Sequence, residues 1–159
     1  MLREKYLLLV WLLMFCLTGC SGAMQQEEAL PQQEESAIID TDHVLYKHFS
    51  ASYEDKTPLL TGVNDINNDG REDLIVIYQD TADTNKMVAI WEEEGNVITS
   101  EPTPAPQENY RLEWRDIDKK PPTELVVSGS KGVNVGYAIY RWENGDFLNL
   151  FGDGMEDCC

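Results

Sequence analysis

The sequence predicts an all-β protein built from two blade-like antiparallel β-meander repeats. Across residues 43–151, aromatic and β-branched residues come in short runs separated by clusters of Asp, Asn, Gly and Pro, which is typical of strands joined by turns. The turns at 94–96 and 144–146 favour hairpins, because Asn and Gly tolerate positive φ angles. An internal repeat divides this β domain into two units, at about 59–100 and 110–151.

The repeat consists of three matching features that share one constant spacing. The matching pairs are Asp65-Ile66-Asn67 with Asp116-Ile117-Asp118, the apolar segment 73–76 with 124–127, and Trp91 with Trp142. An acidic loop, an apolar strand and a tryptophan at one spacing indicate a duplicated unit. Each unit is predicted to contain a strand, the acidic loop, a strand, a turn, a strand, a hairpin and a last strand.

The individual strands follow from the same pattern. They are predicted at 44–49, 59–64, 73–79, 87–92, 96–100, 110–116, 124–128, 135–142 and 147–151, with a proline-rich break at 101–107. In an extended first strand, His43 and His48 point to opposite sides, so they are not expected to act as a pair. Tryptophans at strand positions, among them Trp114, are assigned to the core.

The first acidic loop has the donor pattern of a calcium site. Its oxygen-bearing residues alternate along the chain and a glycine stands at the sharp bend; these residues are Asp65, Asn67, Asp69 and Asp73. Carboxylate and amide oxygens suit a hard cation such as calcium, but Val76 stands where an EF-hand has its final Glu. The alternative is a metal-free Asx turn, in which the carboxylates accept backbone N–H groups.

The loop resembles the DxNxDGxxDL loop of FG-GAP repeats, which are found in integrin-type β-propellers. The resemblance implies a structural calcium ion held by those side chains and by the carbonyl oxygen of Arg71. It covers two units at most, too few for a closed propeller of about 4–8 blades. In the second loop, residues 119–122 (KKPP) replace the Asp-Gly core, so that loop is predicted to bind no metal.

The beginning of the chain has the pattern of an export signal. A short charged segment precedes an apolar run at 6–17, which is too short for a comfortable membrane span. The next residues, Leu17-Thr18-Gly19-Cys20, resemble the bacterial lipobox. The resemblance implies that 1–19 is a signal peptide and that an acylated Cys20 anchors the exported protein at the outer face of a bacterial membrane. Residues 20–42 are predicted to form a disordered acidic tether, or in part a short amphipathic helix.

Charge and motif content exclude several classes of protein. The net charge is −17, and removal of residues 1–19 would leave −18, so phosphate backbones are repelled and a nucleic-acid partner is excluded. The chain shows no Ser–His–Asp arrangement, glycine-rich phosphate loop or Cys-x-x-Cys motif. No enzymatic activity is predicted.

The four cysteines lie at the two ends of the sequence. Cys16 lies inside the leader and Cys20 directly follows the 1–19 segment, whereas Cys158 and Cys159 are the last two residues. No disulfide framework can therefore form within the β domain. Neighbouring cysteines rarely bond to each other, because the small ring strains the peptide between them. The sequence predicts a flexible tail at 152–159 that carries two reduced and reachable thiols.

The surroundings of these thiols favour metal binding over nucleophilic chemistry. Asp153, Glu156 and Asp157 add negative charge, which raises the pKa of a thiol and disfavours its thiolate. A soft cation displaces the thiol protons itself and is attracted by the carboxylates. Two adjacent thiolates, with Met155 as a candidate third donor, suit Cu(I), Zn(II) or a heavier thiophilic ion.

An acidic exported lipoprotein that ends in Cys-Cys resembles the Cys-Cys-COOH (seleno)protein family SaoC. That family accompanies a proposed organometal detoxification system. The resemblance implies that Cys158 and Cys159 bind mercury or an organomercurial and pass it to partners such as thioredoxin-like or transporter proteins. Two alternatives remain: a thiol–disulfide redox partner protein, and a calcium-stabilised β interaction module without metal transfer.

Overall fold

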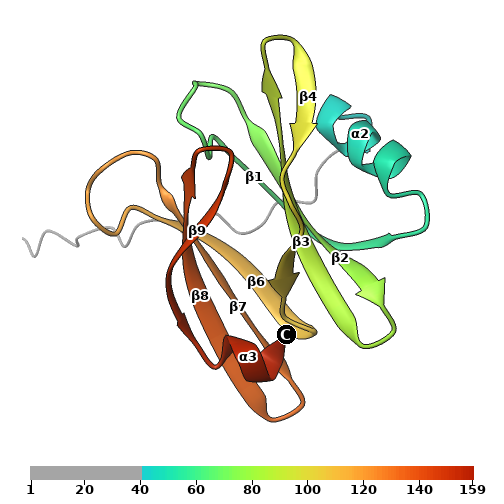
Figure 1. Ribbon diagram of the computed structural model, residues 1–159, viewed down its shortest axis with the longest axis vertical. Coiled ribbons are helices and arrows are strands. Elements are labelled where there is room, and N and C mark those ends of the chain that lie inside the picture. The colour runs from blue at the N-terminus through green and yellow to red at the C-terminus, as the bar shows by residue number, and fades with distance from the viewer. Residues whose placement is uncertain (1–40) are drawn as a thin grey trace, which may run out of the picture. The chain divides into compact units, whose positions relative to one another are not determined.

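The computed structural model describes residues 41–159 (Figure 1). The predictions for the signal peptide, for Cys20 and for the tether up to residue 40 lie outside the described residues. The elements in chain order are α2 (Val44–Ser52), β1 (Thr57–Asn64), β2 (Asp73–Thr81), β3 (Thr84–Glu93), β4 (Asn96–Thr99), β5 (Thr103–Ala105), β6 (Glu108–Arg115), β7 (Glu124–Lys131), β8 (Asn134–Glu143), β9 (Asp146–Asp153) and α3 (Met155–Cys158). Neither helix in this range is long and apolar enough to cross a membrane.

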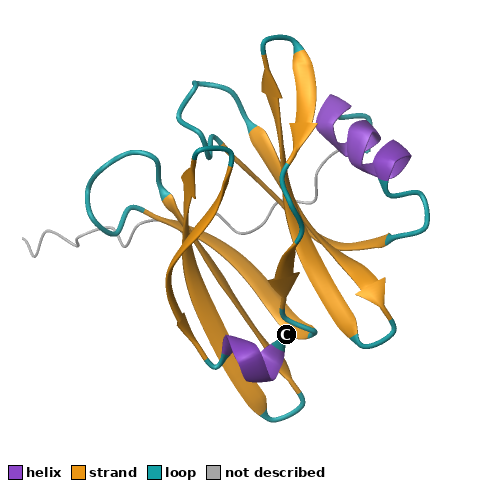
Figure 2. Ribbon diagram, viewed as in Figure 1, coloured by secondary structure: helices purple, strands orange, loops and turns teal. Residues whose placement is uncertain are grey.

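The strands form two antiparallel sheets (Figure 2). The first sheet has the order β1-β2-β3-β4, and β5 pairs with the other half of the same edge of β3. The second sheet has the order β6-β7-β8-β9. Each sheet is a meander of sequential strands, in which an acidic loop makes the first connection and short turns make the next two. The prediction of an all-β protein with two meander repeats is therefore confirmed.

Two clusters of buried side chains hold these elements together. The intersheet core lies between the two sheets and contains Ile66, Ile75, Ile77, Met87, Ala89, Trp91, Ala105, Leu112, Leu125, Val127, Ala138, Tyr140 and Trp142. The helix-side core joins α2 to the other face of the first sheet and contains Leu45, Phe49, Leu74, Val76, Tyr78, Val88 and Ile90. The first sheet is therefore buried on both faces.

The two sheets do not use equivalent faces to form the intersheet core. The face of the second sheet that lies in this core corresponds, by strand pairing, to the face of the first sheet that lies against α2. The row Val63–Leu74–Ile90 across β1, β2 and β3 packs in or against the helix-side core. The equivalent row across β6, β7 and β8, formed by Trp114, Leu125 and Tyr140, packs in or against the intersheet core. The sheets are thus stacked front to back in the manner of consecutive blades, with α2 on the outer face of the first one.

The two tryptophans that suggested the repeat do not occupy equivalent positions. A bulge between Gln79 and Thr81 places one extra residue, Asp80, in the β2–β3 hairpin, whereas the β7–β8 pairing runs without a shift. By strand pairing, the counterpart of Trp91 is consequently Arg141 rather than Trp142. The two indole rings still meet in the intersheet core, with centroids 4.9 Å apart in an edge-to-face arrangement.

The strand predicted at 44–49 is wrong, because these residues form α2. Leu45 and Phe49 are four residues apart, so a helix places both side chains on one face, where they are buried against the first sheet. His43 caps the helix, since its Nδ1 accepts a hydrogen bond from the backbone N–H of Leu45 at 3.3 Å. Tyr53 stacks on Phe49 just beyond the helix, with ring centroids 5.0 Å apart.

Two segments predicted as irregular are regular. Within the proline-rich break, Thr103–Ala105 forms β5 and pairs with the edge of β3, a place where Pro104 can be tolerated because an edge strand leaves N–H positions unpaired. Residues 152–153 extend β9, and Met155–Cys158 form α3. The prediction of a flexible tail at 152–159 is therefore wrong.

Candidate functional site

Helix α3 folds the end of the described chain back onto β8 (Figure 1). It begins after Gly154, whose φ of 65° is in the left-handed region that favours glycine. The backbone N–H groups of Asp157 and Cys158 both donate to Gly154 O at 3.2 Å, and that of Cys159 donates to Met155 O at 3.1 Å. Residues spaced three and four apart on such a turn lie on one side, which brings Met155, Cys158 and Cys159 together.

Three sulfur atoms converge on that side of α3, and we call this group the sulfur site. The Sγ atoms of Cys158 and Cys159 are 3.4 Å apart. Met155 Sδ lies 3.7 Å from Cys158 Sγ and 4.0 Å from Cys159 Sγ. A disulfide bond is about 2.05 Å long, so both cysteines are free thiols. The structure therefore brings the sulfur atoms of Met155, Cys158 and Cys159 within 4.0 Å of one another.

The two thiols differ in exposure. Cys158 is fully buried and Cys159 is partly exposed, so the prediction of two reachable thiols is wrong for Cys158. Gly136 of β8 makes this burial possible. A Cβ atom at Gly136 would lie 2.9 Å from Cys158 Sγ and 2.5 Å from Gly154 O, closer than real contacts allow. The sheet presents bare backbone where α3 docks, which sequence reasoning did not anticipate.

Residues 106–107, which we call the connector because they join the two meanders, also contact α3. The backbone N–H of Gln107 donates to Cys158 O at 3.2 Å. The connector is in turn fixed to the first sheet, because Asn85 Nδ2 donates to Pro106 O at 2.8 Å and to Gln107 O at 3.2 Å. Pro106 packs closely on Gly129, which pairs directly with Gly136 across β7 and β8. Two paired glycines therefore leave room for close packing: Gly129 contacts the connector and Gly136 contacts α3.

Burial dominates the electrostatics of the sulfur site. It raises the pKa of the Cys159 thiol to about 12, with Cys158 adding to the rise and Lys131 opposing it. Burial, with a smaller effect of the two thiols, also raises the pKa of the neighbouring Tyr140 to about 12. At neutral pH the Cys159 thiol is therefore protonated and a weak nucleophile.

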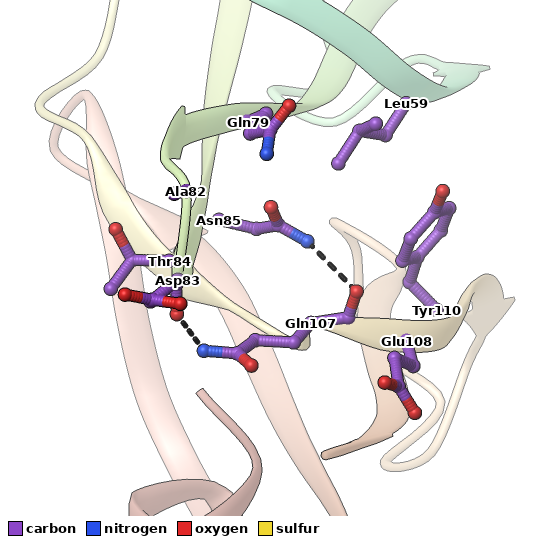
Figure 3. A pocket seen from close by; sticks show the side chains of 9 residues that line it. All are labelled: Leu59, Gln79, Ala82, Asp83, Thr84, Asn85, Gln107, Glu108 and Tyr110. Atoms are coloured by element: carbon purple, nitrogen blue, oxygen red, sulfur yellow. Dashed lines mark hydrogen bonds between the residues drawn. The ribbon is translucent and has the colours of Figure 1, made fainter. Parts of the chain in front are cut away.

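A polar cavity of about 230 Å³ lies on the other side of the connector (Figure 3). Its lining comes from both meanders and consists of Leu59, Gln79, Ala82, Asp83, Thr84, Asn85, Gln107, Glu108 and Tyr110. The side-chain amide of Gln107 donates to the backbone oxygen of Asp83 across this cavity. No sequence pattern pointed to it, because its residues come from several distant segments and share only polar character.

In the first acidic loop, side-chain oxygens accept hydrogen bonds from backbone N–H groups. The Asp65 carboxylate accepts the N–H groups of Asp69 and Gly70 at 3.0 and 2.9 Å, and Asn67 Oδ1 accepts that of Asp69 at 2.9 Å. The Asp69 carboxylate pairs with the Arg71 guanidinium at 2.7 Å, which lowers the pKa of Asp69. Arg71 in turn reaches Glu92 at 3.0 Å.

Asp73 is the buried carboxylate of this loop. Its Oδ2 accepts the N–H of Ile66 at 3.0 Å, and its side chain is 1% exposed. Burial raises the pKa of Asp73 to about 6, and the charges of Asp69 and Asp65 add to that rise. Among the described residues, the carboxylates that converge within 4.8 Å of one another are those of the second loop, not of this one.

In the acidic group at the second loop, a guanidinium pairs with two of the three carboxylates. The converging carboxylates are Asp116, Asp118 and Glu124. Arg141 Nε donates to Glu124 Oε1 at 3.0 Å, and its Nη2 donates to Asp118 Oδ2 at 2.8 Å. Glu124 is fully buried and also accepts the N–H of Ile117 at 2.9 Å. Arg141, which sequence reasoning missed, supplies the cation of this loop from β8.

No family model, curated protein or solved structure matches this chain. The fold and the site together define the class: an all-β protein of two stacked meanders, with a three-sulfur site docked against the second sheet.

Proposed function

We propose that this protein binds a soft metal cation, mercury or an organomercurial among them, through Cys158 and Cys159 and passes it to partner proteins. The observation that carries the proposal is the convergence of two thiols and a thioether, with sulfur–sulfur distances of 3.4 to 4.0 Å, on one helical turn. Thiolate and thioether sulfurs are the donors that soft cations prefer. The resemblance of the sequence to the SaoC family supports mercury as the cargo.

Binding requires the cation to replace the thiol protons. The raised pKa of Cys159 keeps that thiol protonated near neutrality, so each metal–sulfur bond forms as a proton leaves. The same protonation slows attack on a disulfide, which disfavours the redox alternative. A bond between the two cysteines would also have to shorten the present 3.4 Å separation and strain the helical turn.

Transfer to a partner begins at Cys159, the partly exposed thiol. Cys158 becomes reachable when α3 separates from Gly136 and the hydrogen bond from Gln107 breaks. The helix spans only the residues Met155–Cys158, and short terminal elements open at low free-energy cost. The proposal therefore includes a closed state that holds the cargo and an opened state that releases it.

Two further parts of the proposal concern location and calcium. Acylation of Cys20 would tether the protein at the outer face of a bacterial membrane, as the lipobox resemblance implies. Calcium in the loop that contains Asp65, Asn67, Asp69, Arg71 and Asp73 would act as a structural ion. The support comes from the buried carboxylate of Asp73. Its counterpart in the second unit, Glu124, is paired with the cation Arg141, whereas Asp73 accepts hydrogen bonds from backbone N–H groups, so a calcium ion would supply the corresponding positive charge.

The test is retention of mercury by the reduced full-length protein. We expect wild-type protein to retain Hg(II) or methylmercury in native mass spectrometry, and the Cys158→Ser/Cys159→Ser variant to lose it. Both proteins carry Cys16→Ser/Cys20→Ser, because mercury binds any free thiol and Cys158 and Cys159 are then the only cysteines whose loss is tested. Retention by the Cys158→Ser/Cys159→Ser variant would refute the proposal. A mixed disulfide at Cys159 in protein isolated from cells, without retained metal, would favour the redox alternative.

A further inference from the structure

The three sulfur atoms form a triangle of the size that one metal ion needs. Sides of 3.4, 3.7 and 4.0 Å place the point equidistant from all three sulfurs about 2.2 Å from each. A typical metal–thiolate bond is about 2.3 Å long. An ion in the plane of the sulfurs could therefore bond to all three after shifts of roughly 0.1 Å.

A two-coordinate ion fits this arrangement less well. A linear sulfur–metal–sulfur unit, the geometry that Hg(II) favours with two thiolates, separates its sulfurs by about 4.6 Å. The Sγ atoms of Cys158 and Cys159 are 3.4 Å apart, and Cys158 Sγ lies against Gly136, where backbone prevents it from retreating. Linear binding would require Cys159 to swing away from the helix.

The third donor has a definite chemical preference. The Met155 thioether is neutral and soft, and it is held in place because Met155 packs against the intersheet core. Thioether sulfur combined with thiolate selects Cu(I), whereas structural Zn(II) takes four ligands that are usually thiolate or imidazole. The donor set and its spacing agree on the same kind of ion.

We propose that the sulfur site is a three-coordinate site for Cu(I), with Met155 as a ligand beside Cys158 and Cys159. This inference rests on the proposed function of the two thiols and adds Cu(I) to the soft cations that the site would bind. Cu(I) binds without a change of oxidation state, and the two thiols release two protons to solvent. The resulting complex carries one negative charge, and Lys131 is the cation that acts on Cys159.

The test compares Met155→Leu with wild type, both in the Cys16→Ser/Cys20→Ser background under anaerobic conditions. Competition with a colorimetric Cu(I) chelator should show an affinity at least ten-fold lower for Met155→Leu. X-ray absorption at the copper edge should show three sulfur neighbours in wild type and two in the variant. Affinity for Hg(II) should be unchanged, because the linear complex uses the two thiolates. Met87→Leu, the same substitution in the intersheet core, should behave as wild type.

The outcomes separate this inference from the proposed function. Two sulfur neighbours in wild-type protein would overturn the three-coordinate site whether or not the Met155→Leu variant folds. Unchanged Cu(I) affinity in a folded Met155→Leu variant would also overturn it, while the binding role of the thiols would stand. Cu(I) retained by Cys158→Ser/Cys159→Ser would instead refute the proposed function of the thiols.

Discussion

At the scale of single residues, the equivalent buried carboxylates of the two units, Asp73 and Glu124, have different hydrogen-bond partners. Glu124 is paired with the guanidinium of Arg141, whereas Asp73 is held by the backbone N–H of Ile66. Burial disfavours the charged form of a carboxylate and is the main cause of the raised pKa of Asp73, to which the charges of Asp69 and Asp65 add. The ionised carboxylate therefore destabilises the folded state at neutral pH.

This difference predicts a pH dependence of stability in the presence of a calcium chelator. The pKa of Asp73 is about 6 in the folded protein against 3.8 for the unperturbed group, so between these values the folded state binds more protons. The free energy of unfolding should then fall as the pH rises from about 4 to about 6, by at most about 3 kcal/mol. Urea unfolding across this pH range should show that Asp73→Asn removes the fall.

The control for this experiment is Glu54→Gln, which neutralises an exposed carboxylate and should leave the pH dependence intact. The same proteins test the calcium proposal. Calcium at 100 times its dissociation constant would stabilise the wild type by about 2.7 kcal/mol near pH 7, and Asp73→Asn should lose this effect. A wild-type unfolding midpoint that does not respond to calcium would leave the metal-free turn as the correct description.

At the scale of elements, local patterns predicted the strands well and the helices poorly. Alternating apolar residues between turn sequences located eight of the nine predicted strands, because each pattern is local. The wrong prediction is the strand at 44–49, where several residues favour strands. These residues form a helix because Leu45 and Phe49 have helical spacing and pack together against the first sheet. Helix α3 was missed because its docking depends on Gly136, which is distant in sequence and lacks a side chain.

The docking of α3 leads to a prediction about thiol reactivity. Gly136→Ala would place a Cβ 2.9 Å from Cys158 Sγ, so α3 should detach and the fold should lose about 1–3 kcal/mol of stability. In wild-type protein a thiol reagent should label the partly exposed Cys159 faster than the buried Cys158, although the raised pKa of Cys159 keeps its own rate below that of an exposed thiol. In Gly136→Ala both should react quickly, as measured by the time course of labelling and peptide mapping.

Gly152→Ala is the matched control, because a Cβ at that position would meet its nearest atom at 3.6 Å, an ordinary contact. It should preserve the slow labelling of Cys158. Rapid labelling of both thiols in the wild type would show that α3 does not protect Cys158 in solution, and the closed state would have to be abandoned.

At the scale of the whole molecule, the duplicated sequence specifies two similar sheets but not how they stack. The repeat was visible because acidic loops and apolar strands recur at one spacing. The extra residue Asp80 shifts β3 by one position, and such a shift reverses which side chains face the core. For the same reason Arg141, the pairing counterpart of Trp91, points toward Glu124 and could not be assigned that role from the sequence.

The Arg141–Glu124 pair predicts strong coupling within the second sheet. Arg141→Leu would leave the fully buried Glu124 without its cation and should cost about 3–5 kcal/mol of unfolding free energy. The double variant Arg141→Leu/Glu124→Gln should recover most of this loss, since it removes the uncompensated charge. Asp118→Asn, which weakens only the more exposed partner, should have a small effect. Urea unfolding of the wild type, Arg141→Leu, Glu124→Gln and the double variant forms a double-mutant cycle, with Asp118→Asn as its control. Equal losses in the single and double Arg141 variants would contradict the prediction.

Front-to-back stacking gives the pair of sheets a direction. The first sheet ends in a face closed by α2, whereas the last face of the second sheet shows Val135, Tyr137, Leu148 and Phe151 to water. By strand pairing, that bare face corresponds to the one with which the first sheet contacts the second. The stack of sheets is therefore directional. Helix α2 covers its amino-terminal face, so a further sheet could pack only on the exposed face of the second sheet.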